Sequence, residues 1–285
     1  MNVDTTKIIH FDTIREKVKS LCMEANYFLG EDIKIYIEKA IEKESSPLGK
    51  EVLKDLQRNW ELAAKEQIPI CQDTGTAVIF LEIGQEVKIV GGYLYDAINE
   101  GVRKGYREGY LRKSMVKHPW LRVNTDDNTP AIIHTEIVPG NKLKITVAPK
   151  GGGSENMSAL KMLTPAAGLE GVKRFVLESV KKAGPNACPP LVVGVGVGGN
   201  FEKAALLAKK ALLRKLGHFN QDPAIAQVEL ELLKDINKTG IGPQGFGGNT
   251  TALAVNIEVF PCHIASLPVA VNINCHASRH KTIIL

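Results

Sequence analysis

Short apolar segments alternate with amphipathic helical segments over most of this chain of 285 residues. Residues 76–83 form an apolar run typical of a buried strand, and a helical pattern follows over residues 91–109. Residues 191–197 form another short apolar strand, which precedes a helix predicted over residues 201–216. This alternation predicts an α/β fold with mixed sheets.

Two further strands are expected in the middle of the chain. Residues 131–138 and 142–148 alternate polar and apolar side chains, and the turn signal Pro139-Gly140-Asn141 separates them. The pattern predicts an antiparallel hairpin with one solvated face. Other helices are expected over residues 168–182 and 223–237, other strands over 251–259 and 268–273, and loops over 150–155 and 240–248.

The first 67 residues have a helical pattern. Ile33, Ile37 and Ile41 recur at every fourth position, which places them on one helix face. We therefore predict a helical N-terminal lobe over residues 1–67, followed over residues 68–285 by mixed β-sheets flanked by helices. No repeat or evident linker interrupts the chain, so we expect residues 1–285 to form a single domain.

Composition excludes several classes of protein. The net charge is +5, but only 6% of residues are aromatic and no long basic stripe is present, so nucleic-acid binding is not expected. No apolar run approaches the roughly 18 to 20 residues that a transmembrane helix needs, so no membrane association is expected. Residues 1–7 lack the basic and apolar regions of a secretory signal, and the predicted location is the cytoplasm.

The five cysteines do not resemble a disulfide framework, because their number is odd and their spacing irregular. Cys22 lies in a helical pattern and is interpreted as a small core or surface residue rather than a ligand. Cys71, Cys188 and Cys275 each stand alone in Gly-, Pro- or polar-rich segments. Three such thiolates, if the fold brings them together, could bind three irons of a cubane cluster and leave the fourth open to substrate. Cys262 competes with Cys275 as third ligand, and spacing does not choose between them.

The motif Cys71-Gln72-Asp73-Thr74-Gly75 places a possible thiolate beside a carboxylate that could transfer a proton. The alternative interpretation is a turn before a strand, in which Asp73 makes an Asx contact.

Two glycine-rich stretches offer backbone amides to an anion. Residues 150–155 could form an anion-binding nest, but they lack the nucleotide P-loop pattern. Residues 194–199 do not fit Gly-x-Gly-x-x-Gly, so a dinucleotide fold is not expected. Carboxylate binding stays open. His263 precedes the apolar strand that leads to Cys275, although a lone histidine is more often structural.

Taken in order, these segments resemble the alpha subunit, or N-terminal half, of the class I iron–sulfur fumarate hydratases and the related L(+)-tartrate dehydratases. The resemblance runs across nearly the whole chain. Its motifs are Cys-Gln-Asp-Thr-Gly at 71–75, Lys-Gly-Gly-Gly-Ser-Glu at 150–155, Cys-Pro-Pro at 188–190, Gly-Ile-Gly-Pro-Gln-Gly-Phe-Gly-Gly at 240–248 and His-Ile-Ala-Ser-Leu-Pro-Val-Ala-Val-Asn at 263–272, closing on Cys275.

The resemblance implies a [4Fe–4S] cluster bound by Cys71, Cys188 and Cys275, and so favours Cys275 over Cys262. It also implies that the open iron binds the carboxylate and hydroxyl of a small dicarboxylate substrate.

The resemblance further implies the residues that handle the substrate. Asp73 would act as acid or base for the leaving hydroxyl, with His263 as a second catalytic residue. Arg112 would pair with the remote carboxylate of the substrate. The implied substrate-binding residues are Gln72, Asp73, Arg112, Gly152 and His263.

The expected activity is that of a hydro-lyase interconverting (S)-malate and fumarate, and the alternative is the dehydration of L(+)-tartrate to oxaloacetate. A non-catalytic iron–sulfur protein is a third possibility, disfavoured because no matched fourth cysteine is present. A structural zinc site would need paired ligand spacings that are missing. The other half of the family's sequence does not follow Leu285, so we expect a beta subunit as partner and a dimer of the assembled enzyme.

Overall fold

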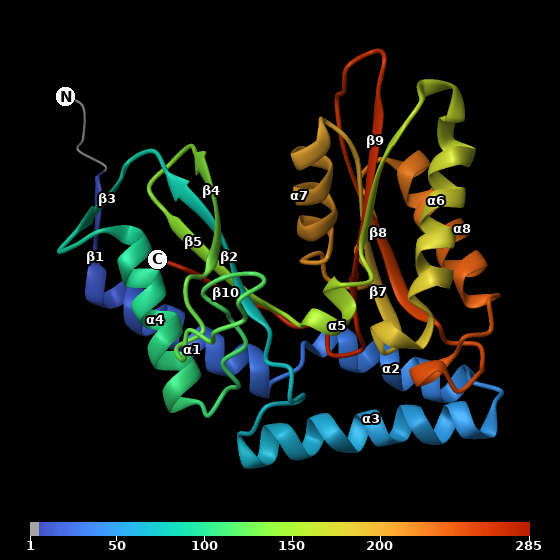
Figure 1. Cartoon of the computed structure of the whole chain (residues 1–285), viewed down its shortest axis with the longest axis horizontal. Coiled ribbons are helices and arrows are strands. Elements are labelled where there is room, and N and C mark those ends of the chain that lie inside the picture. Colours follow the sequence, from blue (N-terminus) through green and yellow to red (C-terminus); the bar gives the residue numbers. More distant parts are fainter. Residues whose placement is uncertain (1–5) are drawn as a thin grey trace. The chain divides into compact units, whose positions relative to one another are not determined.

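The computed structural model describes residues 6–285, and backbone contacts divide the chain into two units (Figure 1). The first unit comprises Met1–Leu29, Trp60–Gly152 and Arg279–Leu285, and the second comprises Gly30–Asn59 and Gly153–Ser278. The predicted lobe of residues 1–67 coincides with neither unit, because α1 (Phe11–Tyr27) belongs to the first and α2 (Glu31–Lys43) to the second. That the whole chain forms one domain in solution stays a prediction.

The first unit is built on a four-stranded sheet in the order β10-β5-β2-β4. Its strands are β2 (Thr76–Gly84), β4 (Ile132–Val138), β5 (Leu143–Lys150) and β10 (Lys281–Ile284). The predicted hairpin is wrong in its pairing, since β2 lies between β4 and β5 and runs parallel to β4 and antiparallel to β5. The turn at 139–141 therefore links strands on the two sides of β2.

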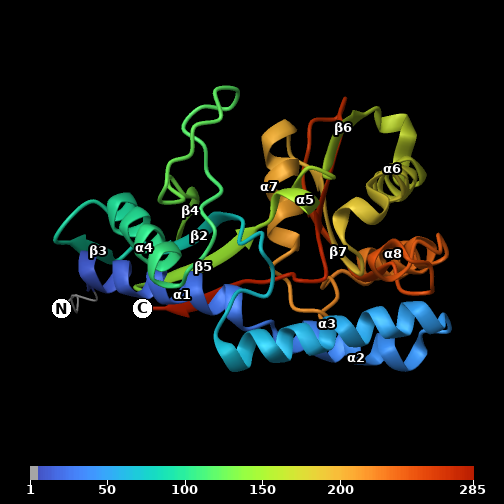
Figure 2. The same cartoon turned by 60° about the horizontal axis from the view of Figure 1, so that its bottom comes forward.

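Helices α1 and α4 (Leu94–Glu108) pack on each other, and α1 also contacts β5 and β10. Their apolar faces form the core of this unit with side chains of the sheet, including Ile79, Leu81 and Val147. A small parallel pair, β1 (Lys7–His10) and β3 (Val87–Val90), was not predicted. Figure 2 shows the long connection between α4 and β4, residues 109–131, extending away from the sheet.

The second unit contains a four-stranded sheet in the order β6-β9-β7-β8. Strands β7 (Leu191–Gly198) and β8 (Ala252–Phe260) are parallel, and β9 (Leu267–Asn274) runs antiparallel to β7 and to β6 (Ala159–Leu163). Helix α7 lies on one side of this sheet, whereas α6 and α8 lie on the other (Figure 1). The bounds of these helices are α6 Gly168–Ala183, α7 Phe201–Ala211 and α8 Pro223–Asn237.

The glycines of β7 serve helix packing. A Cβ at Gly194 would lie 2.1 Å from Ala208 O, and one at Gly196 would lie 2.1 Å from Ala204 O. Both carbonyls belong to α7, so only glycine lets this helix approach the strand so closely. The glycine run that does not fit a dinucleotide motif thus has a structural explanation.

The predicted α/β class, with N-terminal helices and mixed sheets flanked by helices, is confirmed. Helix α3 (Pro47–Glu66) completes the N-terminal helices, and the loop predicted at 150–155 contains the short helix α5 (Gly152–Glu155). No helix in residues 6–285 is long and apolar enough to cross a membrane. The prediction about a secretory signal falls mainly on residues 1–5, which lie outside the described residues.

Candidate active site

The loop of residues 71–75 in the first unit fixes a carboxylate between backbone donors. Gly75 N donates to Asp73 Oδ1 at 3.1 Å, and Gly152 N donates to Asp73 Oδ2 at 2.7 Å. Asp73 N in turn donates to Cys71 Sγ at 3.4 Å. The predicted Asx contact is therefore present, but it uses only one carboxylate oxygen. The other oxygen holds Gly152, so three predicted site residues meet here.

Side chains from distant segments hold the carbonyl groups of this loop. Arg279 donates through Nη2 to Asp73 O, and Tyr106 donates through its hydroxyl to Thr74 O at 2.7 Å. Asn128 donates through Nδ2 to Gly75 O at 3.1 Å. Burial raises the pKa of Tyr106, which keeps its phenol protonated as a donor. No sequence motif marks Arg279, Tyr106 or Asn128, because each reaches the loop only through the fold.

Gly75 is required by the geometry of the loop. Its φ is +74°, and a Cβ there would lie 2.6 Å from the carbonyl carbon of Lys150. A side chain is excluded both by the left-handed conformation and by the close approach of β5.

Gln72 and Arg112 also belong to the first unit, and both side chains are exposed. The backbone of Arg112 is tied to the same loop, since Thr74 Oγ1 donates to Arg112 O at 2.8 Å. The sequence predictions therefore converge on one region, with Cys71, Gln72, Asp73, Gly152 and the backbone of Arg112 connected through a few hydrogen bonds.

In the second unit the segments that carry Cys188 and Cys275 meet. Cys188, an exposed residue with φ +54°, follows a 3₁₀ turn ahead of β7, and Cys275 directly follows β9. His276 N donates to Cys188 O at 3.2 Å. The structure therefore brings two of the three predicted cluster ligands into neighbouring loops at one end of the sheet.

His263 and Cys262 lie at the other end of the same sheet. Both are exposed in the connection from β8 to β9, where His263 Nδ1 accepts from Ala265 N at 3.1 Å. Strand β9 separates them from Cys275, and its 8 residues span seven steps of about 3.3 Å, which is roughly 23 Å. The structure therefore does not bring His263 to the Cys275 end of its own chain.

None of the five cysteines forms a disulfide. Burial raises the pKa of Cys22 to about 12, as expected for a thiol in the core rather than a ligand. Across residues 6–285, no three His, Cys, Asp or Glu side chains gather closely enough to hold a metal ion. Cys71 belongs to the first unit and the other two cysteines to the second, so the three-cysteine site stays a prediction.

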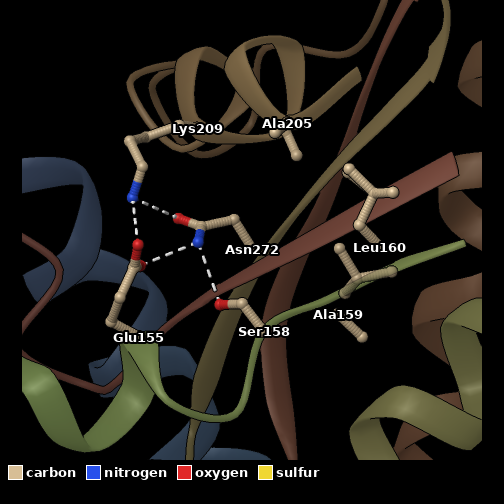
Figure 3. Close-up of a pocket in the computed structure, with 10 residues that line it drawn as sticks. Glu155, Ser158, Ala159, Leu160, Ala205, Lys209 and Asn272 are labelled. Carbon is tan, nitrogen blue, oxygen red and sulfur yellow. Dashed lines mark hydrogen bonds and ion pairs between the residues drawn. The ribbon is translucent and has the colours of Figure 1, made fainter. Parts of the chain in front are cut away.

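The residues just after the glycine-rich stretch take part in a polar network with α7 and β9 (Figure 3). Glu155 Oε1 accepts from Lys209 Nζ at 2.6 Å, and Glu155 Oε2 accepts from Asn272 Nδ2 at 2.8 Å. Asn272 Nδ2 also donates to Ser158 Oγ at 2.9 Å. These side chains border a pocket of about 230 Å³ whose remaining lining is largely apolar. The network anchors residues 155–158 to β9, three residues before Cys275. Glu155 and Asn272 end two of the motifs named above, whereas no motif marks Ser158 or Lys209.

Comparison with known proteins identifies the family. The model of the family described as "Fumarate hydratase (Fumerase)" matches residues 15–284. The chain belongs to this family. It is 46% identical over 277 residues to the putative L(+)-tartrate dehydratase subunit alpha of Methanocaldococcus jannaschii, covering 93% of this chain and 95% of that protein. It is 34% identical over 259 residues to the L(+)-tartrate dehydratase subunit alpha of Escherichia coli K12, covering 90% of this chain and 85% of that protein. The predicted resemblance is therefore confirmed.

Proposed function

We propose that this protein is the alpha subunit of a hydro-lyase that interconverts (S)-malate and fumarate. The observation that carries the proposal is the placement of Asp73, whose carboxylate is oriented by Gly75 N and Gly152 N beside Cys71. Family membership supports the reaction class, and the names of the relatives, which are subunits of dehydratases, support both the class and a multi-subunit enzyme.

The cysteines fit an iron–sulfur cluster as the cofactor. Cys71, Cys188 and Cys275 form no disulfide and have some exposure to solvent. The backbone N–H of Asp73 points at Cys71 Sγ as it would toward a thiolate ligand. We propose that these three residues bind a [4Fe–4S] cluster. When bound, such a cluster supplies a Lewis acid that polarises the hydroxyl group of the substrate.

Asp73 is the proposed proton donor to the leaving hydroxyl. In dehydration its carboxyl group gives a proton to the hydroxyl as the carbon–oxygen bond breaks, and water departs; in hydration the carboxylate takes that proton back. Gln72 and Gly152 would bind the substrate beside it. The exposed guanidinium of Arg112 would pair with the remote carboxylate of the substrate.

The base that removes the proton from carbon is proposed to lie on a beta subunit, as the subunit names of the relatives suggest. His263 is about the length of β9 away from Cys275, so it could serve only a site on another copy of the chain. The proposed dimer of the assembled enzyme allows such a contribution. We propose the cytoplasm as its location, since none of its five cysteines is paired in a disulfide.

L(+)-tartrate is the second candidate substrate, because the relatives carry that name. The test is an anaerobic assay of the chain co-purified with its beta subunit and reconstituted with iron and sulfide, on malate and on L(+)-tartrate side by side. Turnover of malate supports the proposal, and turnover of tartrate alone would assign the second substrate. Turnover of neither, with four irons bound, would overturn both.

A further inference from the structure

The glycine-rich loop of residues 240–248 has no role in the proposed chemistry, yet it contains one residue in a strained conformation. Gln244 has φ +51°, in the left-handed region that a non-glycine residue rarely adopts. The cost of such a conformation persists only where other contacts require it. The contacts of Gln244 should therefore account for its left-handed conformation.

Both nitrogen atoms of Gln244 point to the segment that follows Cys188. Gln244 N donates to Pro189 O at 2.9 Å, and its side-chain Nε2 donates to the same oxygen at 2.6 Å. Since an amide NH₂ has two hydrogens, Nε2 can make a second contact. It lies 3.0 Å from His276 Nδ1.

His276 extends the connection to both cysteines. It follows Cys275 directly, and its backbone N donates to Cys188 O at 3.2 Å. Its Nδ1 lies 3.3 Å from Cys188 O and 3.0 Å from Gln244 Nε2. A protonated Nδ1 can donate to Cys188 O, and an unprotonated Nδ1 can accept from Gln244 Nε2. Gln244 and His276 thus join the loop that bears Cys188 to the loop that bears Cys275.

The loop that presents Gln244 is itself held in place. A Cβ at Gly245 would lie 2.4 Å from Pro185 Cβ, so glycine is needed for the loop to approach the turn before Cys188. At its far end the buried carboxylate of Glu44 accepts from Asn249 N at 2.9 Å and from Thr250 N at 3.0 Å. The amide of Gln244 is therefore presented from a fixed support.

We propose that Gln244 and His276 are positioning residues that set the separation and orientation of Cys188 and Cys275 as cluster ligands. This inference rests on the proposed function. Replacing a residue that hydrogen-bonds to a metal ligand commonly lowers metal affinity by about 10- to 100-fold. The backbone bond from His276 N to Cys188 O joins the two loops, and the side-chain contacts of Gln244 and His276 add further bonds at the same place.

The test compares three variants, Gln244→Leu, His276→Leu and His276→Asn, with a matched control. The control is Gln227→Leu, because the side-chain amide of Gln227 donates a hydrogen bond to Glu231 on the exposed face of α8. The reconstituted complex with its beta subunit is exposed anaerobically to a chelator, and iron loss is followed by absorbance together with the cluster spectrum. We expect the two leucine variants to lose iron at least tenfold faster than the control. His276→Asn, which keeps a polar atom near Nδ1, should restore most of the stability.

A second measurement needs no cluster. The apo chain is titrated with phenylarsine oxide, which bridges two neighbouring thiols, and the protected cysteines are mapped by alkylation and mass spectrometry. Cys188 and Cys275 should be bridged in the wild type and in Gln227→Leu, but at least tenfold more weakly in Gln244→Leu and His276→Leu.

The two measurements separate the failure of each proposal. If the wild type assembles no cluster but the bridging pattern holds, the proposed function fails together with the role in cluster binding, whereas the role of Gln244 and His276 in setting the separation of the two thiols stands. If Gln244→Leu and His276→Leu match the control in both measurements, the positioning role is overturned. A leucine variant that does not fold is replaced by the alanine variant at the same position, which should also lose iron at least about tenfold faster than the control.

Discussion

Asp73 is the proposed proton donor, and both oxygens of its carboxylate accept hydrogen bonds from backbone N–H groups. Replacement by Asn removes the proton that the side chain transfers while keeping its shape. We expect Asp73→Asn to lower kcat by about 10²- to 10⁴-fold, the usual contribution of a general acid. Because the amide has one acceptor oxygen, one of the bonds from Gly75 N and Gly152 N is lost and a small drop in thermal stability is expected, whereas iron content should stay unchanged.

The matched control is Asp126→Asn, at an exposed position of the same unit. It should keep full activity. An Asp73→Asn enzyme as fast as this control would remove Asp73 from the mechanism.

Cys275 and Cys262 are the two candidates for the third cluster ligand, and the structure separates them by the length of β9. Because only Cys275 lies beside the Cys188 segment, Cys275→Ser should abolish cluster assembly while Cys262→Ser leaves it largely intact. Iron and sulfide analysis after anaerobic reconstitution checks this. The reverse pattern would show that Cys262 is the ligand.

Individual site residues were predictable only where they lie in a motif. Cys71, Gln72, Asp73 and Gly152 stand in short segments that resemble a known family. Tyr106 and Asn128 contact the 71–75 loop from 31 and 53 residues away along the chain, measured to Gly75. Such long-range hydrogen bonds depend on the fold, so no local pattern could indicate them.

At the scale of elements, most long helices and apolar strands were predictable from periodicity, whereas strand partners were not. The alternating segments around Pro139 predicted a hairpin, but β2 takes the place between them because its apolar side chains are buried on both faces. The four-residue strands β1, β3 and β10 are too short to give a clear period.

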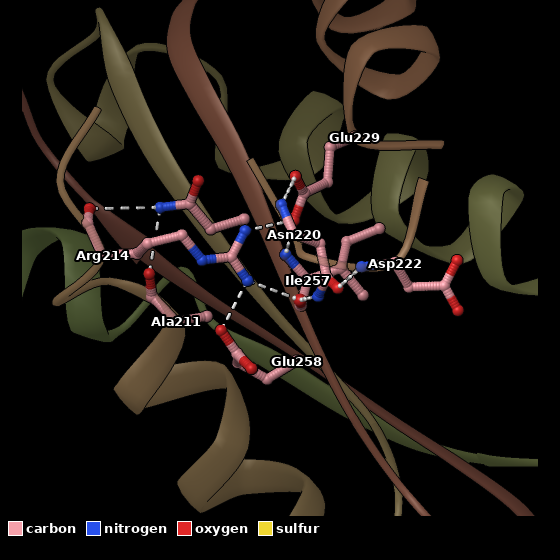
Figure 4. Close-up of polar contacts among 8 residues, drawn as sticks. Ala211, Arg214, Asn220, Asp222, Glu229, Ile257 and Glu258 are labelled. Carbon is pink, nitrogen blue, oxygen red and sulfur yellow. Dashed lines mark hydrogen bonds and ion pairs between the residues drawn. The ribbon is translucent and has the colours of Figure 1, made fainter. Parts of the chain in front are cut away.

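A buried ion pair joins the segment after α7 to α8, and its residues also bond strand β8 (Figure 4). Glu229 Oε1 accepts from Arg214 Nη1 at 2.5 Å and from Ile257 N at 2.7 Å, and Glu229 Oε2 accepts from Asn220 N at 3.0 Å. Only 1% of the Glu229 side chain is exposed. Its removal leaves two backbone donors without this acceptor, and Arg214 keeps only its bonds to Glu258 and to Ile257 O.

We therefore expect Glu229→Ala to lower the free energy of unfolding by about 3–5 kcal/mol. The control is Glu231→Ala on the same helix, where the pair with Lys173 is 41% exposed on the glutamate side and should contribute little. Urea unfolding monitored by circular dichroism measures both. Equal losses would contradict the role given to the buried pair.

For the whole molecule, the two units are assembled from interleaved segments of the chain, so each predicted site residue depends on the folding of a unit rather than of a local stretch. Cys71, Asp73 and Gly152 belong to the first unit, and Cys188 and Cys275 to the second. The proposed chemistry requires residues of both, together with a beta subunit that supplies the base.

Brief aeration of the reconstituted complex tests the three-cysteine cluster most directly. Activity and the electron paramagnetic resonance spectrum are followed during aeration and again after ferrous iron and reductant are added back. A cluster bound by three cysteines should lose its open iron on oxidation. Activity should then fall as the signal of a three-iron cluster appears, and both changes should reverse when iron is restored. Stable full activity after prolonged aeration would contradict the account.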